Sequence, residues 1–255
     1  MMDENPYAPP TAPTEGPELP IAGDPLPWEG SGSWTTRAWE TLRLLLQAPP
    51  EAGQRLAARK VLGPAITFAA LVGLPFQWVG QVLAALWTPL EGGGGNAAFL
   101  KMLGLPQPPP PSPEQLAMAK GILWVQVALT PLLVALGVTI MGLLAHGGLW
   151  MVRGLGSNRG LEVSFRTVLY VSAATAWVGF LGVFGLLLPP PLQAFHLLLS
   201  LALGLGVFTF QGIVLAHAHG VAPWRGILGV FLPWVLLGCC MAACLAPMAM
   251  MGKAG

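Results

Sequence analysis

Charge is what this sequence has least of. Only 9% of its 255 residues are Asp, Glu, Lys or Arg, whereas about a quarter of an ordinary soluble domain is charged. Hydrophobic residues make up 54% of the chain, and the mean hydropathy is +0.65. These values exclude an ordinary water-soluble domain and indicate a protein whose main solvent is lipid.

Cysteine is scarce as well, and its placement excludes two further classes. The three cysteines, Cys239, Cys240 and Cys244, stand together in one late apolar run. They have no mates elsewhere in the chain, which argues against a disulfide framework and against a zinc site built from paired cysteines. We expect them to be small core residues of a helix.

The patterns of catalysis and of nucleic-acid binding are also missing. The chain has no nucleophile beside a base, no phosphate-binding glycine loop and no paired carboxylates. Six acidic residues precede Arg37, the first basic residue, so the amino-terminal end is acidic and nucleic acid is not an expected partner. We expect a protein that is not an enzyme and needs no cofactor.

Long uncharged runs are what the sequence has in abundance. Residues 167–216 contain no Asp, Glu, Lys or Arg, and three prolines at 189–191 divide them. A helix needs about 20 residues to cross a bilayer core of about 30 Å, so this run predicts a transmembrane hairpin. The same criterion over the whole chain predicts an all-α integral membrane protein with a five-helix transmembrane bundle in residues 61–255. The expected spans are about 61–87, 121–152, 167–188, 192–216 and 226–250.

Small residues recur at every fourth position in two of these spans. This spacing lets two membrane helices approach closely, so we expect both faces to be packing seams, within one bundle or between copies in a homo-oligomer. The residues are Ala65, Ala69 and Gly73 in the first span and Gly238, Ala242 and Ala246 in the last.

The amino-terminal 60 residues divide into two parts. Residues 1–30 are rich in proline and acid and poor in large apolar side chains, which predicts a disordered cytoplasmic tail. Its PxxP spacings suit either a solvated linker or a docking segment for a cytoplasmic protein partner. Residues 31–60 contain an amphipathic helix over 34–47. That helix either lies in the lipid headgroup region or packs its apolar face on the bundle.

The basic residues predict the orientation in the membrane. With the amino terminus in the cytoplasm, nine basic residues are cytoplasmic (Arg37, Arg43, Arg55, Arg59, Lys60, Arg153, Arg159, Arg166 and Arg225) and three lie opposite (Lys101, Lys120 and Lys253). This agrees with the positive-inside rule and places the carboxyl terminus on the opposite, outer side of the membrane. The expected face for membrane lipids or a partner comprises Trp34, Arg37, Trp39, Arg43, Arg55, Arg59, Lys60, Arg153, Arg159 and Arg166.

Histidines near the predicted span ends are the candidates for a chemical site. They are His146, His217 and His219. Imidazole is a common zinc or copper ligand, but residues two apart in a regular helix point in different directions. The helix ends that carry them hold no Asp, Glu or Cys. A helix-end role is therefore favoured, and a metal site is the alternative.

Amides are the main polar side chains expected within the membrane, namely Gln77, Gln81, Gln126 and Gln211. Gln77 and Gln81 are four residues apart and share one helix face. Such residues commonly hydrogen-bond a neighbouring helix. The alternative is a polar path, which would make the chain a transporter or permease component.

The order of several short motifs resembles the bacterial branch of the Yip family, membrane proteins with a Ypt/Rab-interacting-protein domain and five predicted spans. The motifs are Pro27-Trp28-Glu29, a helix with Trp39 and Thr41, a Leu-x-x-Pro from Leu46 to Pro49, Ser164-Phe165-Arg166-Thr167 leading to Tyr170, and His219-Gly220 before Trp224-Arg225. Family members often carry an aromatic pair after the Leu-x-x-Pro, and residues 51–56 have none.

The resemblance implies a role rather than a reaction. Eukaryotic relatives are associated with small GTPases and membrane traffic. For this chain it implies a non-enzymatic scaffold or membrane-organising factor that binds lipids or a partner at its cytoplasmic face. Transport and a histidine metal site remain the alternatives.

Overall fold

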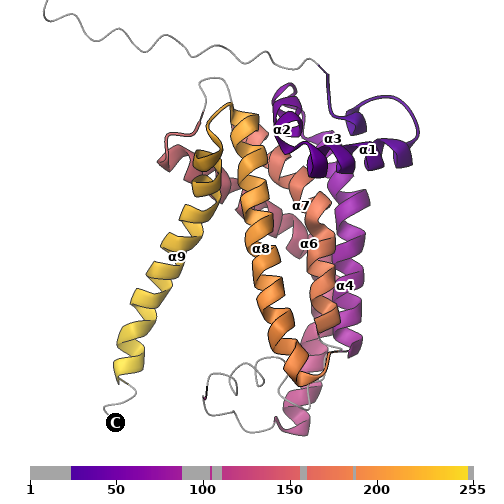
Figure 1. The fold of residues 1–255 in the computed structure, drawn as a ribbon. Helices are drawn as coiled ribbons and strands as arrows, with labels where there is room; N and C mark the ends of the chain where they lie inside the picture. Colours follow the sequence, from indigo (N-terminus) through magenta and orange to yellow (C-terminus); the bar gives the residue numbers. More distant parts are fainter. Residues whose placement is uncertain (1–23, 88–103, 105–110, 156–159, 186–187, 252–255) are drawn as a thin grey trace, which may run out of the picture.

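The computed structural model describes residues 24–87, 104, 111–155, 160–185 and 188–251. These residues form helices and connections, without a strand among them (Figure 1). The elements are η1 (Pro27–Glu29), α1 (Trp34–Gln47), α2 (Pro49–Ala57), α3 (Gly63–Phe68), η2 (Ala69–Gly73), α4 (Leu74–Trp87), α6 (Pro113–Met151), α7 (Leu161–Phe184), α8 (Pro190–His219) and α9 (Pro223–Met251).

Within the described residues, five helices are long and apolar enough to cross a membrane, which confirms the predicted fold class. They comprise Gly63–Leu86, Pro113–Met151, Leu161–Phe184, Phe195–His219 and Pro223–Ala243. Several helices begin earlier than hydropathy predicts. A helix can continue beyond the membrane core until a helix-capping residue ends it. Helix α6 begins at a capping box. The Ser112 side chain accepts a hydrogen bond from the Gln115 backbone N–H, and the Gln115 side chain accepts one from the Ser112 backbone N–H.

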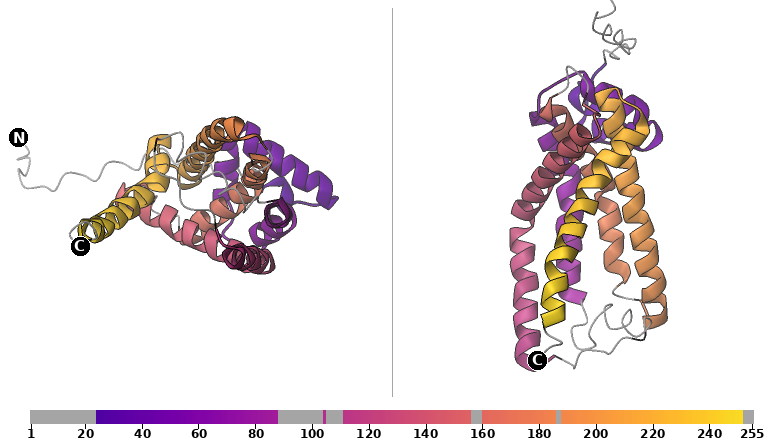
Figure 2. Two further views of the ribbon diagram at one scale, coloured as in Figure 1. Left: turned by 90° about the horizontal axis from the view of Figure 1, so that it is seen from below. Right: turned by 90° about the vertical axis from the view of Figure 1, so that its left-hand side faces the viewer.

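The helices alternate in direction and leave the two ends of the molecule different. Figure 1 shows α1 and α2 gathered over one end of the bundle and the carboxyl-terminal end of α9 at the other. We call residues 24–60, which contain η1, α1 and α2, the cap, and we call the opposite end of the bundle the distal end. The distal part of α9 leans away from the other helices in Figure 1 and in the left view of Figure 2.

The first span is one helix interrupted by a π-helical turn, η2. Pro75 follows this turn and has no N–H to donate to the preceding helical turn, which disturbs the regular ladder. Gly73 lies so close to α7 that a Cβ there would be 2.8 Å from the Cα of Ala173. Ala65 is fully buried in the same contact region. The predicted packing seam of the first span is thereby confirmed.

The second predicted seam does not pack within this chain, and packing between copies in a homo-oligomer stays a prediction. Gly238 and Ala242 are exposed, and a Cβ on Gly238 would meet nothing within 4 Å. The side chain of Ala246 lies outside the described residues. The α9 helix instead uses glycines in its cap-side half, where a Cβ on Gly148 of α6 would lie 1.8 Å from the Gly229 carbonyl oxygen. Helix α9 carries small residues in both halves, and spacing alone does not tell which half meets a neighbour.

The expectation that the cysteines are core residues is wrong for Cys239 and Cys240, the two whose side chains the structure describes. Cys239 and Cys240 are exposed on the distal part of α9 rather than packed in a core. The side chain of Cys244 lies outside the described residues. Helix α9 leans away from the bundle here (Figure 1). Its small residues are therefore exposed and do not contact another helix of this chain.

The cap shares one hydrophobic core with the bundle. Leu26, Leu45 and Leu56 of the cap are fully buried and belong to the same cluster as Phe68 and Tyr170. The predicted tail therefore extends too far, because residues 24–30 are folded and their side chains help to fill this core. Residues 1–23 lie outside the described residues.

Helix α2 docks on α8 without aromatic side chains. A Cβ on Gly53 would lie 2.5 Å from the carbonyl oxygen of Val214, so only glycine permits this approach. Ala52 and Leu56 are fully buried on either side of it. Close backbone contact thus holds α2 on α8, and α2 contributes no aromatic side chain to it.

Candidate membrane-surface site

A buried ion pair joins the cap to the bundle. Glu29 of η1 and Arg166 of α7 form a salt bridge, and their side chains are 1% and 0% exposed. The Tyr170 hydroxyl donates to Glu29 Oε1 at 3.0 Å, and Arg166 Nη1 donates to the Leu56 carbonyl oxygen at 2.8 Å. Arg59 Nε lies 3.9 Å from Glu29 Oε2 at the edge of the cluster. We call Glu29, Arg166, Tyr170 and the Leu56 carbonyl the latch.

The position of Glu29 follows from contacts of its neighbour Trp28. The Trp28 backbone N–H donates to Thr41 Oγ1 at 2.8 Å, and its indole N–H donates to the Pro64 carbonyl oxygen at 2.8 Å. Arg37 donates to the Trp28 carbonyl oxygen at 3.0 Å, and its guanidinium stands 5.2 Å from the indole ring centre. These contacts fix the short turn that carries Glu29 over α7.

The prediction that Arg166 belongs to a lipid-facing surface is therefore wrong. Its guanidinium is fully buried against a carboxylate 137 residues away in the chain. A charge near the end of a transmembrane helix either reaches the headgroups or finds a partner inside the protein. Arg166 has a partner, so its role is to hold the cap in place.

Two of the three histidines meet beside the latch. Ser164 Oγ lies 3.0 Å from His146 Nδ1 and 2.9 Å from His219 Nε2, which ties α6, α7 and α8 together. His217 is turned toward α2, where a Cβ on Gly53 would lie 2.8 Å from the His217 Cβ. The three histidines thus do not converge. In the part of the chain that the structure describes, no three His, Cys, Asp or Glu side chains are placed to share a metal.

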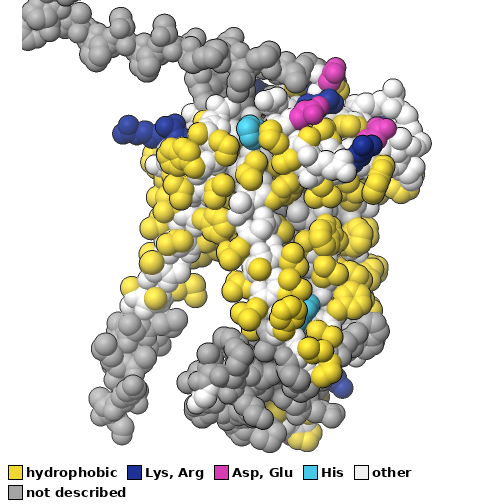
Figure 3. Space-filling view, viewed as in Figure 1, with side chains coloured by type: hydrophobic (Ala, Val, Ile, Leu, Met, Phe, Trp, Pro, Cys, Tyr) yellow, Lys and Arg dark blue, Asp and Glu magenta, His cyan; other side chains and the backbone are white. Residues whose placement is uncertain are grey.

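Helix α1 has the predicted bounds, and it has one buried side and one exposed side. Ala38, Thr41 and Leu45 are buried in the cap, whereas Trp34 is 58% and Trp39 is 67% exposed. The expectation that α1 packs on the protein is therefore confirmed for one of its sides, and a position of the exposed side among lipid headgroups stays a prediction. Figure 3 shows charged side chains gathered at the cap end above hydrophobic flanks.

A groove of about 280 Å³ lies between α1 and the bundle. Its α1 side includes Trp39 and Arg43, and its bundle side includes Phe76 of α4 and Trp177 of α7. Arg43 Nε donates to the Gln47 side chain at 3.0 Å and its side chain is exposed. The groove therefore combines apolar walls with one guanidinium at the level where the cap meets the bundle. We call it the α1 groove.

The remaining basic residues of the predicted lipid face differ in whether their side chains already have a partner within the protein. Arg37 donates a hydrogen bond to the Trp28 carbonyl oxygen, and Arg55 forms an ion pair with Glu51 at 2.6 Å. Arg59 lies beside the latch. Lys60 and Arg153 are exposed. Arg159 lies outside the described residues. Arg43, Lys60 and Arg153 form no ion pair within the described ranges, which leaves them as the cations available to a ligand.

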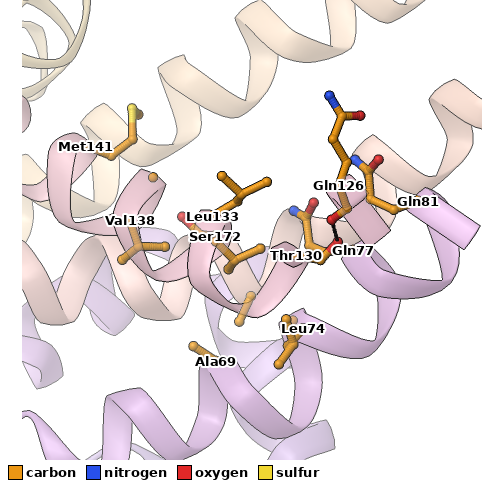
Figure 4. A pocket seen from close by; sticks show the side chains of 14 residues that line it. Ala69, Leu74, Gln77, Gln81, Gln126, Thr130, Leu133, Val138, Met141 and Ser172 are labelled. Carbon is orange, nitrogen blue, oxygen red and sulfur yellow. Dashed lines mark hydrogen bonds between the residues drawn. The ribbon is translucent and has the colours of Figure 1, made fainter. Parts of the chain in front are cut away.

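Three of the four candidate amides come together. Gln77, Gln81 and Gln126 line a cavity of about 450 Å³ between α4, α6 and α7 (Figure 4). Thr130 and Ser172 add hydroxyl groups to its wall. Gln211 is buried in α8 and is not among the residues that line this cavity. We call this space the amide cavity.

Sequence reasoning missed two members of these clusters. The predicted tail includes Glu29, and no sequence pattern singles out Ser172. The sequence contains a signal for Glu29, because Arg166 directly precedes a long uncharged run, and an arginine buried there needs an acidic partner. Tyr170 and Ser164 stood out only as part of the motif order, not as polar contacts.

Comparison with protein-family models, with curated proteins and with solved structures gives no match. The geometry of the cap, the α1 groove and the amide cavity therefore carries the functional argument.

Proposed function

We propose that this chain is a Yip-like, non-enzymatic scaffold of a bacterial inner membrane that organises lipids at its cytoplasmic face. The observation that carries the proposal is the latch, because it fixes α1 across the end of the bundle. A helix fixed in this position presents Trp34, Trp39 and Arg43 at the level of the headgroups rather than on a mobile arm.

The α1 groove fits a phospholipid with an anionic headgroup. Arg43 is placed to meet a phosphate, and Trp39, Phe76 and Trp177 offer apolar walls to an acyl chain. Tryptophan prefers this level of the membrane, and each basic residue near an anionic surface contributes about 1 kcal/mol. The groove thus adds a defined position to a general attraction.

The distribution of charge supports a cytoplasmic cap. Exposed basic residues of the described chain stand mainly at the cap end, where Arg43, Lys60 and Arg153 lie, and Lys120 stands near the start of α6 at the distal end. An excess of basic residues marks the cytoplasmic side. The carboxyl-terminal end of α9, which lies at the distal end in Figure 1, then faces the outside.

The resemblance to the Yip family gains a structural counterpart. Several residues on which it rests, far apart in the sequence, meet in the latch or beside it. They are Trp28, Glu29, Thr41, Ser164, Arg166, Tyr170 and His219. The order of motifs thus describes one folded unit, the cap on the bundle, and supports a Yip-like assignment.

Lipid capture by the full chain tests the proposal. The protein is placed in nanodiscs with equal amounts of phosphatidylglycerol and phosphatidylcholine, and retained lipid is identified by native mass spectrometry. Arg43→Gln combined with Trp39→Ala should lower retention of phosphatidylglycerol about fivefold, since a charge contact and an apolar wall are lost.

Lys120→Gln is the matched control, because it removes the same charge from an exposed position at the distal end. Equal loss of phosphatidylglycerol in both variants would show that only total charge matters and would defeat the proposed lipid site.

The proline-rich tail is the second arm of the proposal. Tethered to the cap, a PxxP segment would hold a cytoplasmic protein at high local concentration beside the membrane. Cross-linking in native membranes, followed by mass spectrometry, should identify a protein that is lost when residues 1–23 are deleted. Recovery of the same proteins without the tail would remove this arm.

A transport component is the second candidate, and the meeting of three amides in one cavity favours it. Against a through-path, Gln211 does not line the cavity, and the cap-side wall is apolar, with Val138, Met141 and Ala69. Flux into liposomes that contain the pure protein, abolished by Gln77→Leu with Gln81→Leu, would make transport the better assignment.

A further inference from the structure

We infer that the amide cavity binds a neutral lipid whose polar end carries hydroxyl or carbonyl groups. This goes beyond the proposed lipid contact at the cap, because the amide cavity lies between different helices and has different chemistry. The observation behind it is the convergence of Gln77, Gln81 and Gln126 from two helices on one space (Figure 4).

The three amides are available to a ligand. Among the described residues, their side chains form no hydrogen bond with another protein group; the dashed line in Figure 4 is the Thr130 hydroxyl donating to the backbone carbonyl of Gln126 at 2.8 Å. Unpartnered amides in a membrane are costly, because lipid tails offer no hydrogen bonds. A ligand with its own donors and acceptors would remove that cost.

The lining has no charged residue, and this selects the class of ligand. Asp, Glu, Lys and Arg are absent from the wall of the amide cavity. A phosphate or an ammonium group there would lose its water without gaining an opposite charge. A primary amide, by contrast, donates to a carbonyl and accepts from a hydroxyl. The site therefore suits an uncharged headgroup.

Polarity changes along the amide cavity in a way that suits an amphiphile. Gln81 and Gln126 stand at its distal end, whereas Val138, Met141 and Ala69 line its cap-side end. From Gln126 to Met141, α6 rises about 22 Å. An apolar chain extending from a headgroup at the glutamines toward the cap would follow this wall. The volume of about 450 Å³ falls within the range of ordinary ligand pockets.

Access is open from the side of the bundle. Gln126, Leu133 and Gly137 all line the amide cavity and are exposed. In a membrane the neighbours of these residues are lipids, so a neutral lipid enters laterally without crossing water. Diacylglycerol supplies a hydroxyl and ester carbonyls, and an isoprenoid quinone supplies two carbonyls, which makes them the two sources to distinguish.

Photolabelling of the full chain in nanodiscs tests the inference. The probe is a diacylglycerol with a photoreactive acyl chain, and we expect its cross-links in α4 and α6. Combining Gln77→Leu with Gln126→Leu should lower labelling at least about fivefold, as expected for loss of one or more hydrogen bonds. Unchanged labelling of this variant would overturn the inference.

A steric variant provides an independent arm in case the double variant does not fold. A Cβ on Gly137 would meet nothing within 4 Å, so Gly137→Leu extends into the amide cavity without a clash against the protein. We expect it to abolish labelling. Gly121→Leu is its control on the same helix, because Gly121 also has open space and does not line the cavity. Equal labelling of both variants would contradict the site.

Competition identifies the headgroup. Unlabelled diacylglycerol that displaces the probe, with no effect of ubiquinone, assigns a hydroxylated glyceride. Displacement by ubiquinone assigns a quinone-type carbonyl, and both results support an uncharged ligand. Equal displacement by phosphatidylglycerol would mean that the cavity holds any bilayer lipid, and this result overturns the inference, as does a wild-type chain that is not labelled at all.

Discussion

The cap side and the distal side of the bundle are built differently. Half of the apolar window of α7 is buried, compared with 17% in each of the other four spans. The two buried clusters both lie toward the cap and include Leu56, Tyr170 and Val230. The amide cavity begins beside these clusters and extends toward the distal side, which also has the outward-leaning part of α9. The polar and glycine contacts near the cap therefore define the fold, and the distal side is left open for lipid.

Breaking the latch should have the largest effect. Arg166→Met leaves the Glu29 carboxylate buried without its arginine, and removal of one partner from a buried ion pair costs about 3–5 kcal/mol. We expect a large fall in the thermal unfolding temperature of the full chain in detergent and rapid trypsin cleavage within α1 and α2.

Arg55→Met is the control, since its ion pair with Glu51 is exposed and such a pair contributes about 0.5 kcal/mol. Glu29→Leu together with Arg166→Met should recover much of the loss, because neither charge is then left alone. Similar unfolding temperatures for Arg166→Met and Arg55→Met would refute the special role of the cap side.

Overpacking a glycine should have an intermediate effect that depends on its position along α9. Gly148→Val places atoms where α6 touches Gly229, and overpacking of this kind costs about 1–3 kcal/mol. Gly238→Val, in the distal half, meets nothing within 4 Å and should leave the unfolding temperature unchanged. The comparison would fail if Gly238→Val were the more damaging change.

The histidine contact should give the smallest of the three effects. Ser164→Ala removes one hydroxyl that joins His146 and His219, which should cost about 1 kcal/mol in the free energy of unfolding. Thr175→Val serves as control, because that hydroxyl only bonds the carbonyl of Val171 in its own helix. A denaturant titration that ranks the two variants in the opposite order would show that Ser164 does not join the helices.

The parts of the fold that sequence predicts are those set by local pattern. Helix α1 has the predicted bounds because Ser33 caps its start and Pro49 begins the next helix. The five spans follow from uncharged length alone, and the first small-residue seam follows from spacing. Each of these signals is contained within a few turns of one helix.

What sequence did not predict depends on contacts between distant segments. Glu29 and Arg166 are 137 residues apart, and counting charges by loop treats both as surface groups. Periodicity puts Gln77 and Gln81 on one face but gives no information that Gln126 of another helix faces them. The choice between the two small-residue halves of α9 likewise depends on which half its neighbours reach.

Hydrogen exchange of the full chain in nanodiscs tests the central claim, that residues 24–60 form a cap fixed on the bundle. The account predicts that amides of residues 26–30 and 38–56 exchange as slowly as those of the cap-side half of α7, and that Arg166→Met releases them selectively. Fast exchange of these residues in the wild-type chain, with α7 still protected, would contradict it.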